Sequence, residues 1–320
     1  MRPVKRSILY KSAFLKESEL CSLIYSFTDI LLFMLRRSIY LLSVCLLFAL
    51  PGCNLINPEE EIPTYLRVDS FQYLPAATFP ATSSHKINSV YVYDENYLMG
   101  VWELPALIPV QTKDAGKKLL LLPGVDYNGI RSQQSIYPFF SGDTLTVHPE
   151  PGQVIPYTAK TGYVTNAQML WSENFELSNK MNVKLSGDTV IIPVTGPDQV
   201  FEGARSGGVF LTGEGQSSES ISTDGFAIDY RKETFLELNY KNTVPVQIGL
   251  LTTPYALGEP YYEYIIGLKP SENWNKVYVD LRPFAGNFQG AQYRLVLRVH
   301  DEGGAAGYAL FDNLQVVSYE

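Results

Sequence analysis

The amino-acid sequence predicts an all-β fold, with two antiparallel β-sandwich domains that follow a cleaved N-terminal signal peptide. Beyond residue 53, short runs of aliphatic and aromatic residues are separated by Gly, Pro, Asn and Asp, which is the pattern of strands and turns. No long apolar stripe of helical spacing occurs in this part of the chain. The clearest strand predictions are residues 86–93, 117–122, 234–240, 276–281 and 293–299.

Two of these runs alternate with a period of two, and each predicts a strand with two different faces. In the run 234–240, Leu236 and Leu238 share one face, whereas Glu237 and Asn239 lie on the other. In the last run, the polar residues on the face opposite to the leucines are Arg294, Arg298 and His300. Such strands belong to antiparallel sheets with one packed and one wet side, so both polar faces are expected in water.

Residues 34–52 predict a signal peptide. The stretch 38–50 carries no charge and follows Arg36 and Arg37, which is the order of the basic and hydrophobic regions of an export signal. A membrane-spanning helix needs about 20 apolar residues, so this stretch is too short to serve as one. We therefore expect the leader to start at Met34.

The upstream segment, residues 1–33, has two interpretations. It contains a second apolar run, residues 20–33, which Asp29 interrupts. A charge at the centre of a membrane span is costly, so we interpret the segment as an upstream mis-start or an extra apolar segment. The alternative is a membrane hairpin of two segments.

The end of the leader resembles the lipobox of bacterial lipoproteins. Leu50, Pro51 and Gly52 precede Cys53. The resemblance implies cleavage between Gly52 and Cys53, alkylation of the Cys53 thiol with lipid, and a mature protein that begins at this cysteine. The alternatives are a plain membrane anchor and an internal hydrophobic helix.

Removal of residues 1–52 leaves an acidic protein. The full chain has 25 Lys or Arg and 33 Asp or Glu, and the leader holds seven and three of them, so 18 and 30 remain and the net charge is −12. Nucleic acid is therefore excluded as a partner, since phosphate binding needs concentrated positive charge. Two of the three cysteines also leave with the leader, so stability depends on core burial rather than on disulfides.

Residues 53–63 are predicted to be the lipidated cysteine and an extended acidic linker. Two prolines and three successive glutamates favour an extended, self-repelling tether. Acidic residues soon after a lipidated cysteine resemble the export signal of Bacteroidota surface lipoproteins. That resemblance implies an outer-membrane protein that faces outward, and a simple solvated spacer on the inward-facing leaflet is the alternative.

Residues 64–168 are predicted to be the first sandwich, of immunoglobulin-like or transthyretin-like type. Turn signals such as Asn128-Gly129 separate its strands. In the stretch 100–109, Pro105 and Pro109 exclude a central strand and favour an edge strand or a crossing loop that Trp102 packs.

Residues 169–320 are predicted to be the second sandwich, and both of its ends resemble the galactose-binding-like jelly rolls of carbohydrate-binding modules. Glu176 follows an aromatic residue at the start, and Asp312-Asn313 precedes an aliphatic run at the end. In many such modules the two ends meet at a structural calcium ion, so the resemblance implies Glu176 and Asp312 as Ca²⁺ ligands. The alternative is that Asp312 caps a turn and Glu176 is solvated.

Sugar binding needs aromatic faces with polar groups around them. The candidates are Tyr261, Tyr262 and Tyr264, which flank Glu263, and Trp274 between two asparagines. Aromatic residues in strands more often belong to the core, and a solvated face explains the row of Arg294, Arg298 and His300 adequately.

Enzyme chemistry has little support in the sequence. The three histidines have no metal-site spacing, and neither H-E-x-x-H nor G-x-S-x-G occurs. A pair of glycosidase carboxylates stays open, because 30 acidic residues allow many pairs. We therefore expect a non-catalytic, lipid-anchored envelope protein that captures glycans. The alternatives are a structural adhesin or assembly subunit that binds a protein, and a glycoside hydrolase component.

Overall fold

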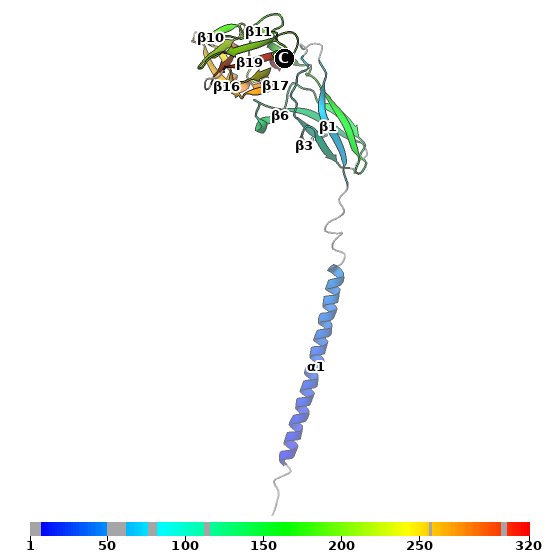
Figure 1. Ribbon diagram of the computed structural model, residues 1–320. Coiled ribbons are helices and arrows are strands. Elements are labelled where there is room, and N and C mark those ends of the chain that lie inside the picture. Colours follow the sequence, from blue (N-terminus) through cyan, green and yellow to red (C-terminus); the bar gives the residue numbers. More distant parts are fainter. Residues whose placement is uncertain (1–7, 50–61, 76–81, 112–115, 256–257, 302–305) are drawn as a thin grey trace, which may run out of the picture. The chain divides into compact units, whose positions relative to one another are not determined.

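The computed structural model describes residues 8–49, 62–75, 82–111, 116–255, 258–301 and 306–320 (Figure 1). The chain divides into two compact units, residues 1–61 and 62–320. Gly52, Cys53 and most of the predicted linker lie outside the described residues.

The first unit contains one helix, α1 (Ile8–Ala49). This helix passes without a break through the apolar run 20–33 and on to residue 49, and the two-segment hairpin stays an untested alternative. Within the described residues, none of the helices has both the length and the apolar character for a membrane crossing.

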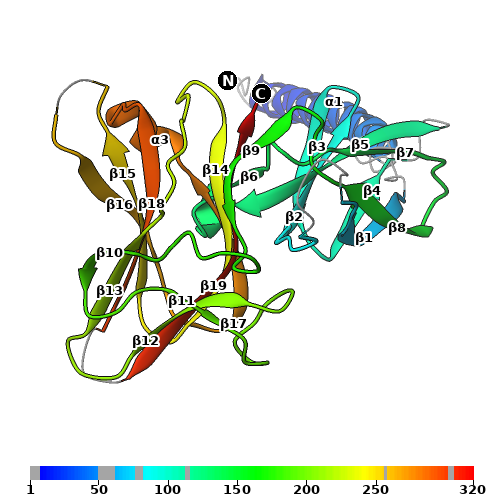
Figure 2. The same cartoon turned by 90° about the horizontal axis from the view of Figure 1, so that it is seen from above.

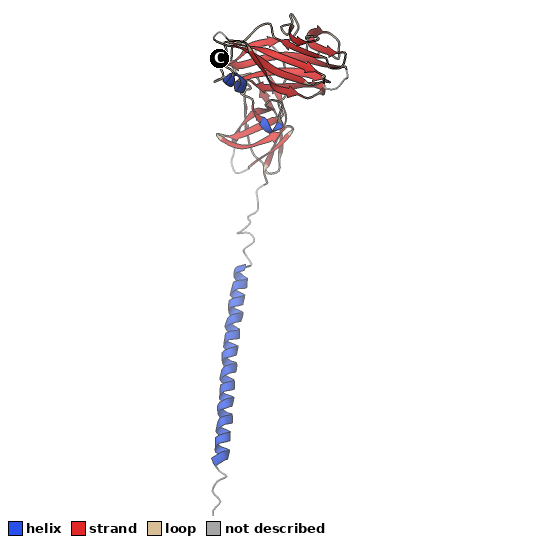
Figure 3. Ribbon diagram, turned by 90° about the vertical axis from the view of Figure 1, so that its left-hand side faces the viewer, coloured by secondary structure: helices blue, strands red, loops and turns tan. Residues whose placement is uncertain are grey.

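The second unit is built almost entirely of strands, which confirms the all-β prediction (Figure 3). Its first sandwich pairs a three-stranded sheet, ordered β4-β1-β8, with a sheet ordered β3-β2-β5-β6 in which β7 also pairs with β5. The bounds of these elements are β1 Thr64–Tyr73, β2 Ser89–Asp94, β3 Tyr97–Glu103, β4 Ala106–Val110, β5 Lys117–Asp126, η1 Arg131–Gln133, β6 Gln134–Ile136, β7 Asp143–Val147 and β8 Val154–Thr161. The pairing of β1 with β8 is parallel, and the other pairings of this sandwich are antiparallel.

The chain crosses between the two sheets of this first sandwich at the proline-containing stretch. β3 and β4 are edge strands of different sheets, and Pro105 lies between them. Pro109 lies within β4, where an edge position tolerates a residue without an N–H donor. Trp102 packs against the core of the sandwich.

The second sandwich consists of a six-stranded and a five-stranded antiparallel sheet (Figure 2). The six-stranded sheet is ordered β11-β12-β19-β14-β17, with β9 also paired to β19, and the five-stranded sheet is ordered β10-β13-β18-β15-β16. The bounds are β9 Ala167–Glu173, β10 Val183–Gly187, β11 Ile192–Val194, β12 Ser206–Leu211, β13 Ser217–Ile221, β14 Thr234–Asn242, β15 Val246–Thr253, β16 Tyr261–Leu268, β17 Ser271–Asp280, α3 Arg282–Asn287, β18 Gln292–His300 and β19 Gly307–Tyr319. Alternate residues of both sheets, such as Leu236 and Leu238 on one and Leu295 and Leu297 on the other, form a single core.

The opposite face of β14 is not in water, which corrects the expectation for Glu237 and Asn239. Both side chains are buried, with exposed fractions of 0% and 2%. Tyr137 and Phe139 lie over this face and pack against Phe235 of β14. The first sandwich therefore covers the outer side of the six-stranded sheet.

Candidate functional site

The outer side of the five-stranded sheet carries polar and aromatic residues that are only partly buried. On β15, which lies between β18 and β16, Val246, Ile248 and Leu250 point into the core. The residues between them therefore point outward, because successive side chains of a strand alternate. On β18 the same alternation turns Arg294 and Arg298 outward.

Tyr262 and Tyr264 lie together on this outer face. Tyr262 is in register with Leu251 and Tyr264 with Gly249, and both partners belong to the outward set of β15. Their ring centroids are 6.1 Å apart and the ring planes meet at 85°. Tyr262 is 42% exposed, so part of its side chain is accessible to a ligand.

Tyr264 extends across the sheet toward β13. Its hydroxyl donates a hydrogen bond to Glu219, and β15 and β18 lie between the two strands. Adjacent strands are about 4.8 Å apart, so the ring must lie along the sheet surface to reach that far. Gly249, the register partner of Tyr264, has no side chain to obstruct this path. Burial, and then the hydrogen bond and the charge of Glu219, raise the pKa of the Tyr264 hydroxyl, so it remains a donor.

Arg298 and Gln247 add fixed polar groups beside the rings. The Arg298 guanidinium lies 5.8 Å from the Tyr264 ring centroid, and its Nη1 donates to Gln247 Oε1 at 3.2 Å. Arg294 is anchored by its Nε, which donates to the carbonyl oxygen of Ser222 at 2.5 Å. The face thus combines aromatic rings with amide, carboxylate and guanidinium groups, which are the groups that orient a polyhydroxylated ligand.

The other two predicted aromatic residues lie elsewhere. Tyr261 is in register with Thr252, on the opposite side of β16 from Tyr262, and stacks on Phe288 at 4.6 Å. Trp274 belongs to β17 of the six-stranded sheet and packs against Phe201 at 5.3 Å. The structure therefore brings together only Tyr262 and Tyr264.

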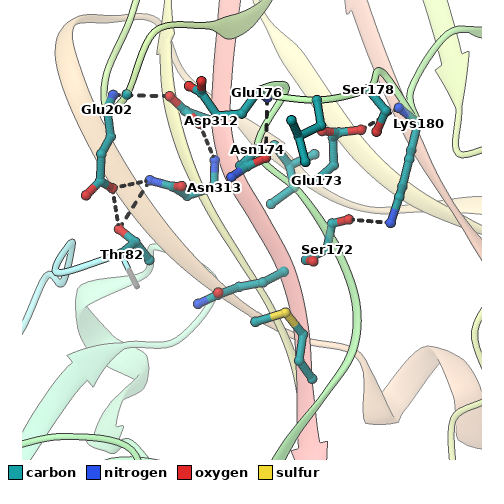
Figure 4. A pocket seen from close by; sticks show the side chains of 15 residues that line it. Thr82, Ser172, Glu173, Asn174, Glu176, Ser178, Lys180, Glu202, Asp312 and Asn313 are labelled. Atoms are coloured by element: carbon teal, nitrogen blue, oxygen red, sulfur yellow. Dashed lines mark hydrogen bonds between the residues drawn. The ribbon is translucent and has the colours of Figure 1, made fainter. Parts of the chain in front are cut away.

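Glu176 and Asp312 do converge, as the resemblance to carbohydrate-binding modules implied. Both line a pocket of about 390 Å³ to which Glu173 and Glu202 also contribute (Figure 4). Thr82 closes one side of it, with a hydroxyl that donates to Glu202 Oε2 at 2.7 Å.

The carboxylates of this pocket are already engaged by hydrogen-bond donors. Glu176 Oε1 accepts the backbone N–H groups of Ala204 at 2.7 Å and Arg205 at 2.9 Å. Asp312 Oδ2 accepts the Ser206 hydroxyl at 2.6 Å and the Glu202 N–H at 3.2 Å. These oxygens point at separate donors rather than at one shared centre.

Such an arrangement does not fit a calcium ion, which needs six to eight oxygens around one point. The described part of the chain holds no group of three or more His, Cys, Asp or Glu side chains placed to share a metal ion. Calcium binding by Glu176 and Asp312 stays a prediction of the resemblance, and the geometry of the described residues adds no support to it. Burial raises the pKa of Asp312 to about 6, and hydrogen bonds from Ser206, Asn313 and Glu202 only partly offset that rise.

Sequence reasoning assigned no role to Glu219 and Gln247, and it interpreted Arg294 and Arg298 as a solvated row. The alternation of Arg294, Val296 and Arg298 was visible in the sequence. The pairing of β13, β18, β15 and β16, which sets these residues beside the tyrosines, was not, because it joins segments up to about 80 residues apart.

No protein-family model matches this chain, and no curated protein matches it. Among solved structures, it is similar to one described as showing the promiscuous specificity of carbohydrate-binding modules from the β-sandwich superfamily, with 17% identity, a TM-score of 0.36, and coverage of 72% of this chain and 84% of that one.

Two further similar structures are smaller. One is TmCBM61 in complex with β-1,4-galactotriose, with 14% identity, a TM-score of 0.30, and coverage of 45% of this chain and 97% of that one. The other is a point mutant of a carbohydrate-binding module of family 29, with 14% identity, a TM-score of 0.30, and coverage of 48% and 90%. The chemistry proposed for the outer face of the five-stranded sheet follows from the residues of that sheet alone.

Proposed function

We propose that this protein is a non-catalytic, lipid-anchored binding protein of the bacterial envelope that captures glycans on the outer face of its five-stranded sheet. The observation that carries the proposal is the group formed there by Tyr262, Tyr264, Arg298 and Gln247. Their placement on one accessible sheet face, rather than in the core, distinguishes this group from ordinary strand aromatics.

The physical argument is that sugars present both apolar and polar surfaces. The C–H groups of a pyranose ring favour contact with an aromatic face, and its hydroxyls need donors and acceptors in fixed positions. Tyr262 offers the accessible ring, while Tyr264, Arg298 and Gln247 are held in place by their mutual contacts. Preorganised side chains lose less conformational entropy when a ligand binds.

The test is affinity electrophoresis of the full-length chain, in mild detergent, through gels that contain single polysaccharides. Retardation on at least one glycan should disappear in Tyr262→Ala. The matched control is Tyr97→Ala, since Tyr97 is 78% exposed on the first sandwich and far from this sheet in the chain. Loss of retardation in Trp274→Ala alone would instead move the site to the six-stranded sheet.

Two other outcomes would favour the alternative functions. Release of reducing ends from any polysaccharide would indicate a hydrolase, for which the acidic pocket of Glu173, Glu176 and Asp312 is the place to search. Absence of retardation on every glycan, together with capture of a defined envelope protein, would indicate an adhesin or assembly subunit.

The lipid anchor is a separate part of the proposal. Its support is the order of basic residues, apolar stretch and Cys53 in the sequence. We propose an outer-membrane protein exposed at the cell surface. Labelled palmitate should enter the wild-type protein and be absent from Cys53→Ala, and protease added to intact cells should cleave the protein if it faces outward.

A further inference from the structure

The arginines of the candidate face differ from most others in the compact unit. Four other arginines of residues 62–320 lie within 4.0 Å of a carboxylate oxygen, namely Arg67, Arg131, Arg231 and Arg282. Over the described residues, neither Arg294 nor Arg298 forms such an ion pair. Two guanidinium groups on one face of an acidic protein therefore lack a carboxylate in direct contact among the residues that the structure describes.

The nearest candidate for such a partner is held by other groups. Glu219 is in register with Arg298 across β13 and β18. Its two oxygens accept hydrogen bonds from the hydroxyls of Tyr264 and Ser186 instead. Arg298 packs on the Tyr264 ring. Together, Glu219, Tyr264, Arg298 and Arg294 carry one net positive charge.

The two arginines also stand at the right spacing to act on one ligand. They lie on the same face of β18 with Val296 and two other residues between them, so their Cα atoms are separated by about 13 Å. Leu251 lies between Arg294 and Tyr262 in the cross-strand register, which puts the Cα atoms of Tyr262 and Arg294 two strand spacings, about 10 Å, apart. One oligosaccharide of a few sugar units can therefore contact the tyrosine and both arginines.

From these observations we infer that the glycan recognised on this face is anionic, and that Arg294 and Arg298 bind its carboxylate or sulfate groups. The inference rests on the proposed glycan-binding function and specifies its ligand class. A guanidinium matches the planar pair of oxygens of a carboxylate or two oxygens of a sulfate, and its hydrogen bonds to such anions are about twice as strong as neutral ones.

The experiment compares the full-length wild type with the double variant Arg294→Gln/Arg298→Gln on three probes at physiological salt. Polygalacturonate presents carboxylates, dextran sulfate presents sulfates, and dextran is neutral. We expect the wild type to bind an anionic probe at least about tenfold more tightly than dextran, and the double variant to lose that preference. The anionic probe that binds more tightly identifies the group as carboxylate or sulfate.

Arg67→Gln/Arg131→Gln is the matched control, because it also removes two positive charges, here from exposed arginines of the first sandwich. An equal loss of affinity in this control would indicate general electrostatic attraction and overturn the inference. Preference for a neutral glycan, unchanged in the double variant but lost in Tyr262→Ala, would also overturn it while leaving the proposed function intact. Failure to bind any glycan would overturn both.

Discussion

The two sheets of the second sandwich use charged residues on their outer faces in opposite ways. On the six-stranded sheet, Glu237 and Lys276 are 0% and 3% exposed as side chains and form an ion pair of 2.8 Å beneath the first sandwich. On the five-stranded sheet, Arg294 and Arg298 are only partly buried and pair with no carboxylate of the described chain.

The buried pair is stabilised by a complete set of partners. Glu237 Oε1 accepts the hydroxyls of Tyr137 and Tyr163, each at 2.6 Å, and Oε2 accepts Gln315 Nε2 at 3.0 Å besides the lysine. Lys276 Nζ also donates to the carbonyl oxygen of Ser84 at 2.9 Å. A buried charge is tolerated only when it is paired and hydrogen-bonded, so this face of the six-stranded sheet is committed to structure, whereas the five-stranded sheet carries the proposed ligand site.

The largest expected effect comes from separating the buried pair. Lys276→Met leaves the Glu237 carboxylate without its cation in a site that excludes water. We expect the free energy of unfolding of the full-length protein to fall by about 3–5 kcal/mol, measured by urea denaturation. Glycan binding by the remaining folded protein should be unchanged, because the other face is untouched.

A second variant shows whether the unpaired charge of Glu237 causes this loss of stability. Glu237→Gln/Lys276→Met removes both charges and keeps an acceptor for Tyr137 and Tyr163, so it should recover more than half of the lost stability. A loss below about 1 kcal/mol in the single variant would mean that the junction of the sandwiches admits water, and the contrast between the two faces would disappear.

Asp312 is a buried carboxylate that accepts hydrogen bonds but forms no ion pair with any cation in the described part of the chain. It lies on β19 beside Asn239 of β14 and is 1% exposed. Its pKa rises from 3.8 to about 6 on folding, so the folded state binds the proton more tightly than the unfolded state. The stability contribution is therefore complete below about pH 4 and is lost as the pH rises through about 6; for a difference of about two pKa units it amounts to about 3 kcal/mol.

Urea denaturation between pH 4 and 7 measures this contribution. The wild type should lose stability relative to Asp312→Asn as the pH rises from 4 to 7, and the difference between them should level off above about pH 7. Glu272→Gln, at an exposed position of β17, is the control and should follow the wild type. Parallel curves for wild type and Asp312→Asn would show that Asp312 is hydrated or bound to a cation.

A smaller effect is expected from one hydroxyl at the junction. Tyr137→Phe removes one of the two hydroxyl donors to Glu237 Oε1 and should cost about 2 kcal/mol in urea denaturation, because a hydrogen bond to a charged group contributes more than a neutral one. Tyr319→Phe, which removes a bond of the same 2.6 Å length to the Pro138 carbonyl oxygen, should cost about 1 kcal/mol. Equal losses would mean that Glu237 is not charged in the folded protein.

The sequence could predict strands but not which of their faces would stay wet. The period of two in residues 234–240 and 293–299 identified both inner faces, since that alternation is a local property. The coverage of Glu237 could not be predicted, because it depends on Tyr137 and Tyr163, which lie 100 and 74 positions away. The convergence of Glu176 and Asp312 was predictable only through a resemblance, whereas their engagement by N–H donors depends on the loop at residues 202–206.

The smallest stability effect should come from the arginines of the open face. Arg298→Gln removes a guanidinium whose contacts are one hydrogen bond to Gln247 and the Tyr264 ring, so we expect a loss below about 1 kcal/mol in urea denaturation. Arg282→Gln is the matched comparison, because Arg282 pairs with both Asp280 and Glu233 at 2.7 Å and should cost more. A larger cost for Arg298 than for Arg282 would mean that Arg298 serves the fold, since a residue kept for a ligand contributes to binding and little to folding. The same variant should therefore change glycan affinity more than it changes the free energy of unfolding.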